Sequence, residues 1–352
     1  MDQRDLIIIG GGQSALACGY FLRRTEINYL ILDASPECGG AWLNAWDSLT
    51  LFSPPEYSSL PGWFMPESKE EFPDREEVIS YLCAYEKRYE LPVQRPVKVL
   101  EVTKDSDLFT IKTSDGTYQS KAVISATGTF GKPFIPPIPG WEKFQGVQLH
   151  SSGYRNAKEF SGQKVLVVGE GNSGAQILAE ISKVATAKWS TRKEPEFLPD
   201  NVDGRVLFDV ASAMYHAEQK GEKFDAAKYN LSNIVMVPPV KEARERGVLQ
   251  SSGSFREMDE NGVIWDDGTH ENFDAIIWCT GFRYATSHLD ELLDTDEQGK
   301  VKTDDTKAVE MPGLWLVGYG GWTGFASATL IGVGRSAKKT VMEVEEYIKG
   351  VD

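Results

Sequence analysis

Residues 6–15 read LIIIGGGQSA, and this stretch decides how the chain folds. The four apolar residues at 6–9, three of them β-branched, predict a buried strand of a parallel sheet. Gly10, Gly12 and Ala15 match the pattern GxGxxG/A, in which glycine allows a tight turn and a close backbone approach. The next residues predict a helix over 14–24, whose free N-terminal amides suit a pyrophosphate. The stretch predicts a dinucleotide-binding α/β domain, and a purely structural turn is the alternative.

The second expected strand, residues 29–32, ends in an acidic residue. Asp33 lies 23 positions after Gly10 (33 − 10). A carboxylate at this place accepts hydrogen bonds from ribose hydroxyls and repels a 2′-phosphate. The glycine-rich loop that follows contains Gly40 and Trp42, and it lets the backbone pass close to a flat cofactor.

The same order of elements occurs twice in the chain. Each half runs from a strand through a GxGxxG/A motif and a helix to a second strand, an Asp-Gly hairpin and a strand that ends in Thr-Gly. The first motif glycine and the Thr-Gly glycine are 118 residues apart in one half (128 − 10) and 112 apart in the other (281 − 169). Two motifs at matching offsets predict two Rossmann-like domains, the two-domain architecture of disulfide-reductase-like flavoproteins.

The second half carries cations where the first carries Asp33. Its second strand runs into Ser190 and Thr191, and Arg192 and Lys193 follow. Hydroxyls and two cations suit a 2′-phosphate, because an arginine fork grips two phosphate oxygens, and a solvated basic loop is the alternative. The simplest assignment is FAD in the first half and NADPH in the second, with NADH possible.

The expected domains and cofactor contacts follow from this assignment. Residues 1–150 and 282–352 form the FAD-binding domain, and residues 151–281 form the NADPH-binding domain with a helical insertion at about 199–250. The expected FAD contacts are Gly10, Gly12, Gln13, Ser14, Asp33, Gly40, Ala41, Trp42, Val97, Ala126, Thr127, Gly128 and Phe325. The expected NADPH contacts are Gly169, Gly171, Asn172, Ser173, Gly174, Ser190, Arg192, Lys193, Thr280 and Gly281, with Asn172 and Ser173 capping the phosphate loop. Five aromatic residues are expected to wall the substrate pocket or the flavin: Trp42, Trp46, Phe52, Trp322 and Phe325.

The composition of the chain limits the kinds of partner and the location that we expect for the protein. The chain has 352 residues and a net charge of −15, which argues against a nucleic-acid partner or an anionic membrane. No apolar run reaches about 18 residues, so no membrane span is expected, and the N-terminus does not fit a signal peptide. The four cysteines at 18, 38, 83 and 279 form no CxxC pair. We therefore expect no metal site, no redox dithiol and a reduced, cytoplasmic location.

Residues 144–154 carry a longer signature. They read FQGVQLHSSGY and fit FxGxxxHxxxY just before the second glycine motif. The chain resembles class B flavin monooxygenases, the flavin-containing and Baeyer–Villiger types, over essentially its whole length. The resemblance implies that NADPH reduces FAD and that O2 then forms a C4a-(hydro)peroxyflavin. One oxygen atom passes from it to a small sulfide, amine or ketone. No catalytic side chain is implied, and His150 and Tyr154 would serve a domain hinge or the NADP site.

The sequence departs from the family at two places. The loop Ser53-Pro54-Pro55 lacks the asparagine that several members place near the flavin, and Tyr154-Arg155 ends the signature unlike Baeyer–Villiger enzymes. Sulfoxidation is therefore favoured over ketone oxidation. The main alternative is a flavin reductase or oxidase that passes electrons to a quinone, ferredoxin or O2 without oxygen insertion. A disulfide reductase would need a partner for Cys38, and a redox sensor would need no flavin. A homodimer is expected from the family alone.

Overall fold

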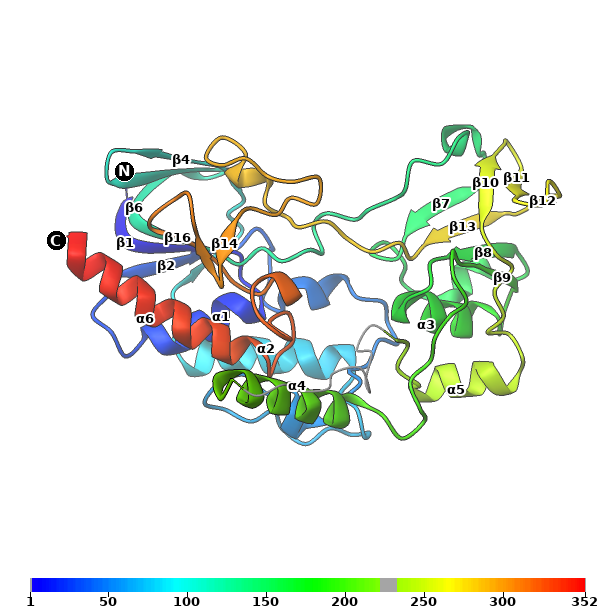
Figure 1. The fold of residues 1–352 in the computed structure, drawn as a ribbon, viewed down its shortest axis with the longest axis horizontal. Helices are drawn as coiled ribbons and strands as arrows, with labels where there is room; N and C mark the ends of the chain where they lie inside the picture. Colours follow the sequence, from blue (N-terminus) through cyan, green and yellow to red (C-terminus); the bar gives the residue numbers. More distant parts are fainter. Residues whose placement is uncertain (1, 222–232, 352) are drawn as a thin grey trace. The chain divides into compact units, whose positions relative to one another are not determined.

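The computed structural model describes residues 2–221 and 233–351, which divide into two compact units (Figure 1). The first unit consists of Met1–Leu43, Ser53–Lys132 and Arg283–Asp352, and the second of Asn44–Phe52 and Pro133–Phe282. Both units are built on a parallel sheet with helices, so the predicted two-domain α/β architecture is confirmed. Among the described residues, no helix is long and apolar enough to cross a membrane.

The first unit is organised around β1 (Asp2–Ile9), which pairs in parallel with β2 (Tyr29–Leu32) and β6 (Gly116–Ser125). Its last four residues are buried, as the run of apolar residues predicts. The strand order is β14-β15-β16-β6-β1-β2-β3, and β4 and β5 extend from β6 as an antiparallel hairpin. The remaining strands are β3 (Val93–Gln94), β4 (Val99–Asp105), β5 (Leu108–Thr113), β14 (Thr303–Asp304), β15 (Lys307–Ala308) and β16 (Leu314–Leu316).

Strand β6 differs from the sequence expectation. The sequence pattern alone predicts a short hairpin strand over 117–120 and a separate buried strand over 122–125, but the structure has one continuous strand. Its first half pairs antiparallel with β5, and the strand pairs in parallel with β1 and β16. One strand therefore joins the hairpin to the central sheet.

The described part of the first unit contains three α-helices: α1 (Gln13–Leu22), α2 (Arg75–Arg88) and α6 (Val333–Val351). Helix α2 begins at a capping box in which Asp74 accepts from the backbone of Glu77 and Glu77 accepts from that of Asp74. Helix α6 packs against α1. The sequence predicts this helix over 327–349, ended by Gly350. The helix begins six residues later, because a series of turns that includes the left-handed Ala326 (φ +56°) precedes it. Gly350 lies within the helix and does not end it.

The second unit contains a parallel sheet of order β7-β13-β8-β9 and a separate antiparallel sheet of order β10-β11-β12. Alternate residues of β8 face two clusters: Val165 and Val167 pack with α3, whereas Leu166 and Val168 pack with Phe255 of β10. The elements are β7 (Val147–His150), β8 (Lys164–Val168), α3 (Asn172–Ile181), β9 (Thr186–Ser190), α4 (Gly204–Gln219), α5 (Pro238–Glu245), β10 (Phe255–Met258), β11 (Gly262–Trp265), β12 (His270–Asn272) and β13 (Ala275–Trp278).

The unit boundary lies earlier than the predicted residue 150. Strand β7 pairs with β13 of the second sheet, so residues 133–150 belong to the second unit. The predicted helix within the insertion is confirmed as α4, and α5 is an additional helix that the sequence analysis did not identify. Residues 222–232 of the predicted insertion lie outside the described part of the chain.

Candidate functional site

The first glycine of each motif is required by the fold itself. Gly10 has φ +104°, and a Cβ atom there would lie 2.7 Å from the carbonyl oxygen of Ala126. Gly169 has φ +126°, and its Cβ would lie 2.2 Å from the carbonyl oxygen of Cys279. In both units the turn after the first strand therefore passes against the end of a neighbouring parallel strand, where no side chain fits.

The middle glycine of each motif has a different reason to be glycine. Gly12 and Gly171 are the N-caps of α1 and α3, with φ −82° and −97°, which any residue adopts. A Cβ on Gly12 would meet only the Cα of Gly40, at 3.9 Å, and one on Gly171 would meet nothing within 4 Å. Neither helix has a side-chain hydrogen bond at its N-cap, and the first amides of a helix have no partner within the helix itself. Both turns fit a dinucleotide pyrophosphate.

The loop after β2 closes onto the first of these turns. Gly40 has φ +58°, and a Cβ there would lie 2.8 Å from the Cα of Gly12. Ala41 is exposed and Trp42 is half-buried. The carbonyls of Trp42 and Leu43 accept hydrogen bonds from Arg75, at 3.2 and 2.8 Å, so the loop is fixed to the start of α2.

Asp33 is buried at the end of β2 and is already engaged by the protein. Its Oδ2 accepts from Nε of Arg95 at 2.8 Å, and its Oδ1 accepts from the amide of Ser35 at 3.1 Å. The other two nitrogens of Arg95 donate to both carboxylate oxygens of Glu86, at 2.8 and 2.6 Å. Val97 is also buried, and its amide donates to the carbonyl of Asp33 at 2.7 Å. A ribose contact at Asp33 stays a prediction, and sequence reasoning missed Arg95.

The prediction that the four cysteines include no paired thiols was wrong. Cys38, in the loop after β2, forms a disulfide with Cys83 of α2, with the two Cα atoms 5.3 Å apart. The two residues are 45 positions apart in the sequence, so spacing did not reveal the pair. Cys18 and Cys279 are free and buried. The loop that carries Gly40 is therefore covalently tied to α2.

A chain of hydrogen bonds, each with a defined donor and acceptor, begins at Thr127 in the Thr-Gly segment of the first unit. The hydroxyl of Thr127 donates to the carbonyl of Ala285 at 2.7 Å, so it accepts from Tyr319, also at 2.7 Å. Tyr319 in turn accepts from Ser125 at 2.6 Å, and Ser125 accepts from Nε2 of His288 at 3.0 Å. Burial lowers the pKa of His288 to about 4, so the imidazole is neutral near pH 7.

The other predicted FAD contacts also lie in the first unit, and their side chains range from buried to exposed. Gln13 donates from Nε2 to the carbonyl of Ala328 at 2.6 Å, which joins the start of α1 to the segment before α6. Ser14 is buried against Gly318, and Phe325 is exposed. Gly128 has φ +64° with open space around its Cβ position, like Gly281 in the second unit.

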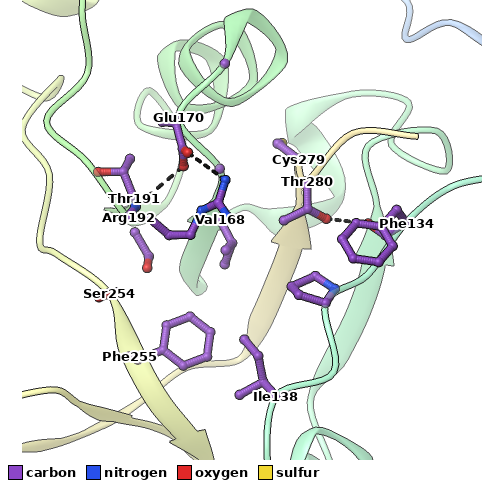
Figure 2. A pocket seen from close by; sticks show the side chains of 14 residues that line it. Phe134, Ile138, Val168, Glu170, Thr191, Arg192, Ser254, Phe255, Cys279 and Thr280 are labelled. Carbon is purple, nitrogen blue, oxygen red and sulfur yellow. Dashed lines mark hydrogen bonds and ion pairs between the residues drawn. The ribbon is translucent and has the colours of Figure 1, made fainter. Parts of the chain in front are cut away.

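The second unit has a cavity of about 540 Å³ where β8, β9 and β13 end (Figure 2). Its lining includes five predicted NADPH contacts: Gly169, Gly171, Ser190, Arg192 and Thr280. Thr191, whose hydroxyl was also expected to suit the 2′-phosphate, lines the cavity as well. Sequence reasoning missed the other lining residues, Phe134, Pro136, Ile138, Val168, Glu170, Ser254, Phe255 and Cys279. The alternation of Phe134, Pro136 and Ile138 was a usable signal, because every second residue of an extended segment lies on one face.

The charged residues that line this cavity are Arg192 and Glu170, and the side chain of Arg192 is 85% exposed. Its guanidinium pairs with Glu170 at 3.0 Å, as Figure 2 shows. The hydroxyls of Ser190 and Thr191 point inward and donate to the carbonyls of Gly253 and Lys193, at 2.9 and 2.7 Å. Both hydroxyls therefore donate within the protein, and a contact with the 2′-phosphate stays a prediction. Exposed Lys193 lines a second cavity of about 630 Å³ that also includes Arg192.

Asn172 does not cap the second glycine turn as expected. Its Oδ1 accepts from the amide of Val235 at 2.9 Å, so it fixes a residue within the insertion. Ser173 follows it in the first turn of α3. Gly174 has a packing role, because a Cβ there would lie 2.2 Å from the carbonyl oxygen of Gly169. That carbonyl accepts from Nε1 of buried Trp189 at 2.8 Å.

His150 and Tyr154 are both occupied inside the second unit. The Nε2 of His150 lies 2.9 Å from the carbonyl of Gly281, an acceptor, so this nitrogen carries the proton, and Nδ1 accepts from the amide of Ser152 at 3.1 Å. Burial lowers the pKa of His150, which favours this neutral form. Buried Tyr154 donates to Glu180 at 2.8 Å. Both geometries agree with a structural role, and a hinge or NADP role stays a prediction.

The expected aromatic wall is divided between the units. Trp46 is buried in the core of the second unit, with its ring centroid 6.4 Å from that of Tyr154. Phe52 stacks on Phe208 of α4 at 6.0 Å. Trp322 packs in the first unit and donates to Thr303 at 2.9 Å. Trp46 is therefore a core residue.

The chain matches one described protein family over residues 7–318. It belongs to the pyridine nucleotide-disulphide oxidoreductase family. The flavin-containing monooxygenase of Stenotrophomonas maltophilia is 48% identical, with a TM-score of 0.90 and 99% of each chain covered. The uncharacterised oxidoreductase CzcO of Bacillus subtilis is 33% identical over 97% of this chain and 99% of that one. The probable indole-3-pyruvate monooxygenase YUCCA1 of Arabidopsis thaliana is 30% identical over 98% and 91%.

These similarities confirm the resemblance to flavin monooxygenases within the pyridine nucleotide-disulphide oxidoreductase family. The protein is an oxidoreductase of the flavin-dependent monooxygenase type. Monooxygenases of this family use FAD and NADPH, so the predicted cofactor pair is confirmed at the level of the family.

Proposed function

We propose that the protein uses NADPH to reduce FAD and inserts one oxygen atom from O2 into a small soft nucleophile, a sulfide or an amine, or into a ketone. FAD occupies the glycine turn of the first unit, and NADPH occupies that of the second. The observation that carries this proposal is the matched pair of N-caps at Gly12 and Gly171, which no side chain caps and where the fold itself has no need of glycine.

The residues of the two units have different tasks in this proposal. In the first unit, the amides at the start of α1 hold the pyrophosphate and Asp33 accepts from the ribose. In the second, the amides at the start of α3 hold the pyrophosphate, and Arg192 exchanges its Glu170 partner for the 2′-phosphate. FAD supplies the redox and oxygen chemistry when it is bound, and the chain supplies binding, orientation and exclusion of water.

The experiment that tests the oxygenase activity measures coupling. The protein with FAD and NADPH receives ¹⁸O2 and an aryl methyl sulfide, and mass spectrometry detects the label in the sulfoxide. Peroxide and NADPH consumption are measured in the same reaction. Labelled sulfoxide in amounts close to the NADPH consumed supports the proposal. Peroxide equal to NADPH with sulfide, amine and ketone alike would establish the oxidase or reductase alternative.

The NADPH assignment has its own test at Arg192. We expect Arg192→Ala to raise KM for NADPH at least about 10-fold, because it removes a charge-assisted contact to phosphate, and to leave KM for NADH nearly unchanged. Glu170→Gln should lower KM for NADPH, since it frees Arg192 from its ion pair at 3.0 Å. Arg244→Ala is the matched control, as Arg244 pairs with Asp200 at 2.7 Å on the surface of the same unit. Equal effects of Arg192→Ala on both nucleotides would contradict the assignment.

A further inference from the structure

We propose that the Cys38–Cys83 disulfide is a thiol-exchange site, and that its reduction weakens the hold of the first unit on FAD. The inference rests on the proposed placement of FAD at the glycine turn of that unit. Three independent features support it: the attachment of the loop to α2, the contact of that loop with Gly12, and the contrast between this cysteine pair and the other two cysteines.

Helix α2 holds the loop after β2 at three places along its length. At its first residue, Arg75 donates to the carbonyls of the loop's last residues, at 3.2 and 2.8 Å. In its third turn, Cys83 forms the disulfide with Cys38. Near its end, Glu86 binds Arg95, which binds Asp33 at the start of the loop. The disulfide is the only covalent tie described between the loop and α2, and it joins the loop at its middle.

The middle of the loop is also the part that meets the glycine turn. Gly39, next to Cys38, has φ +121°, and its Cβ position lies 3.2 Å from the side chain of Ile79 on α2. The following residue, Gly40, approaches Gly12 closely, with its Cβ position 2.8 Å from the Gly12 Cα. The disulfide is therefore two residues from the backbone contact that shapes the proposed pyrophosphate site. Opening it frees this part of the loop while Arg75 and Asp33 still hold the two ends.

The four cysteines differ in how well a reagent can reach them. Cys38 and Cys83 are half-buried, so part of each residue is exposed to solvent. Cys18 and Cys279 are buried, and burial raises the pKa of Cys18 to about 12 and raises that of Cys279 as well. A thiol reacts as its thiolate, so these two cysteines are inert near neutral pH. Thiol exchange is therefore directed to the pair that fixes the loop.

The reaction requires a dithiol reductant, either a small molecule or a protein. A thiolate of the reductant attacks one sulfur, the S–S bond breaks, and the other cysteine leaves as a thiolate that takes up a proton. The second thiol of the reductant then attacks the mixed disulfide and releases the first cysteine. Two electrons and two protons pass to the protein, and the reductant leaves as a disulfide.

The experiment compares FAD release from the oxidised and the reduced full-length protein. FAD-loaded protein is treated with dithiothreitol, freed of reductant under argon and diluted, and the rise of free-FAD fluorescence gives the release rate. We expect release about 10-fold faster after reduction, because the loop loses its preorganisation. Iodoacetamide and mass spectrometry should show label on Cys38 and Cys83 only. Reoxidation with diamide should restore slow release.

Two variants separate the possible outcomes. Cys38→Ser/Cys83→Ser should release FAD at the fast rate with and without dithiothreitol, whereas Cys18→Ala should respond like the wild type. Labelling of both cysteines without a change in release would overturn the inference, and so would two unpaired thiols in diamide-treated protein. Gly12→Val tests the underlying placement. If Gly12→Val binds FAD as tightly as the wild type, the placement fails. If Gly12→Val loses FAD and reduction leaves the FAD release rate of the wild type unchanged, only the disulfide inference fails.

Discussion

Replacing Arg95 by methionine is expected to lower the free energy of unfolding of the first unit by about 3–5 kcal/mol. The guanidinium donates three hydrogen bonds of 2.6–2.8 Å, one to Asp33 and two to Glu86. The side chains of Arg95, Asp33 and Glu86 are only 12%, 6% and 18% exposed. Methionine keeps much of the aliphatic packing but leaves two largely buried carboxylates without their cation.

The magnitude follows from the number and burial of these contacts. A hydrogen bond to a charged group contributes about 1.5–3 kcal/mol, so three of them give about 5–9 kcal/mol. The substitution also removes the cost of burying the guanidinium, which offsets several kcal/mol and brings the net effect into the range measured for broken buried ion pairs.

The assay is urea unfolding of the FAD-free protein followed by circular dichroism, with hydrogen exchange of the β2 amides to assign the loss to the first unit. Lys112→Met is the matched control. Lys112 pairs with Glu101 at a similar distance, 2.7 Å, but the two side chains are 56% and 32% exposed. This control should lose less than about 1 kcal/mol. An Arg95→Met protein within 1 kcal/mol of the wild type would refute the reasoning.

Three further predictions concern the first unit. Gly40→Val should lower FAD affinity at least about 10-fold in a calorimetric titration, because it combines strain at positive φ with a clash against Gly12. Gly116→Ala, at positive φ in open space, should bind FAD normally. His288 is held neutral, so its stabilisation is complete above its unfolded pKa of 6.5 and falls as the pH drops towards about 4. Between pH 7 and 4.5 the loss is about 2 kcal/mol, and His288→Gln should remove it from the pH dependence of urea unfolding. Asp74→Ala should cost about 1 kcal/mol in thermal unfolding through loss of the cap of α2, and Asp74→Asn should lose less.

The parts of the fold that sequence could predict are those encoded locally. Residues 6–9 and 165–168 are continuous apolar runs next to glycine turns, and both are buried in strands. The unit boundary could not be predicted in the same way, because β7 pairs with β13 about 128 residues later (275 − 147). The residue at which α6 begins could not be predicted from the sequence either. Alanine rarely adopts a left-handed backbone, so nothing in the sequence marked Ala326.

The candidate site shows the same division between local and distant information. The motif glycines and Arg192 were identified from short patterns and lie where the sequence placed them, at the ends of parallel strands. The hydrogen bond of Ser190 could not be predicted, because its acceptor, the carbonyl of Gly253, is 63 residues away. The Cys38–Cys83 pair was missed because its formation depends on where α2 packs.

The three-segment composition of the first unit has a consequence for synthesis on the ribosome. Strand β6 ends at Ser125, but its parallel neighbour β16 begins at Leu314, 189 residues later (314 − 125). At about 5–20 residues per second, translation of that interval takes about 10–40 s. All segments of the second unit, up to Phe282, are made before β16. During that time the β6 edge of the nascent sheet has no β16 to cover it, which makes it a site for chaperone binding or for misassociation between nascent chains.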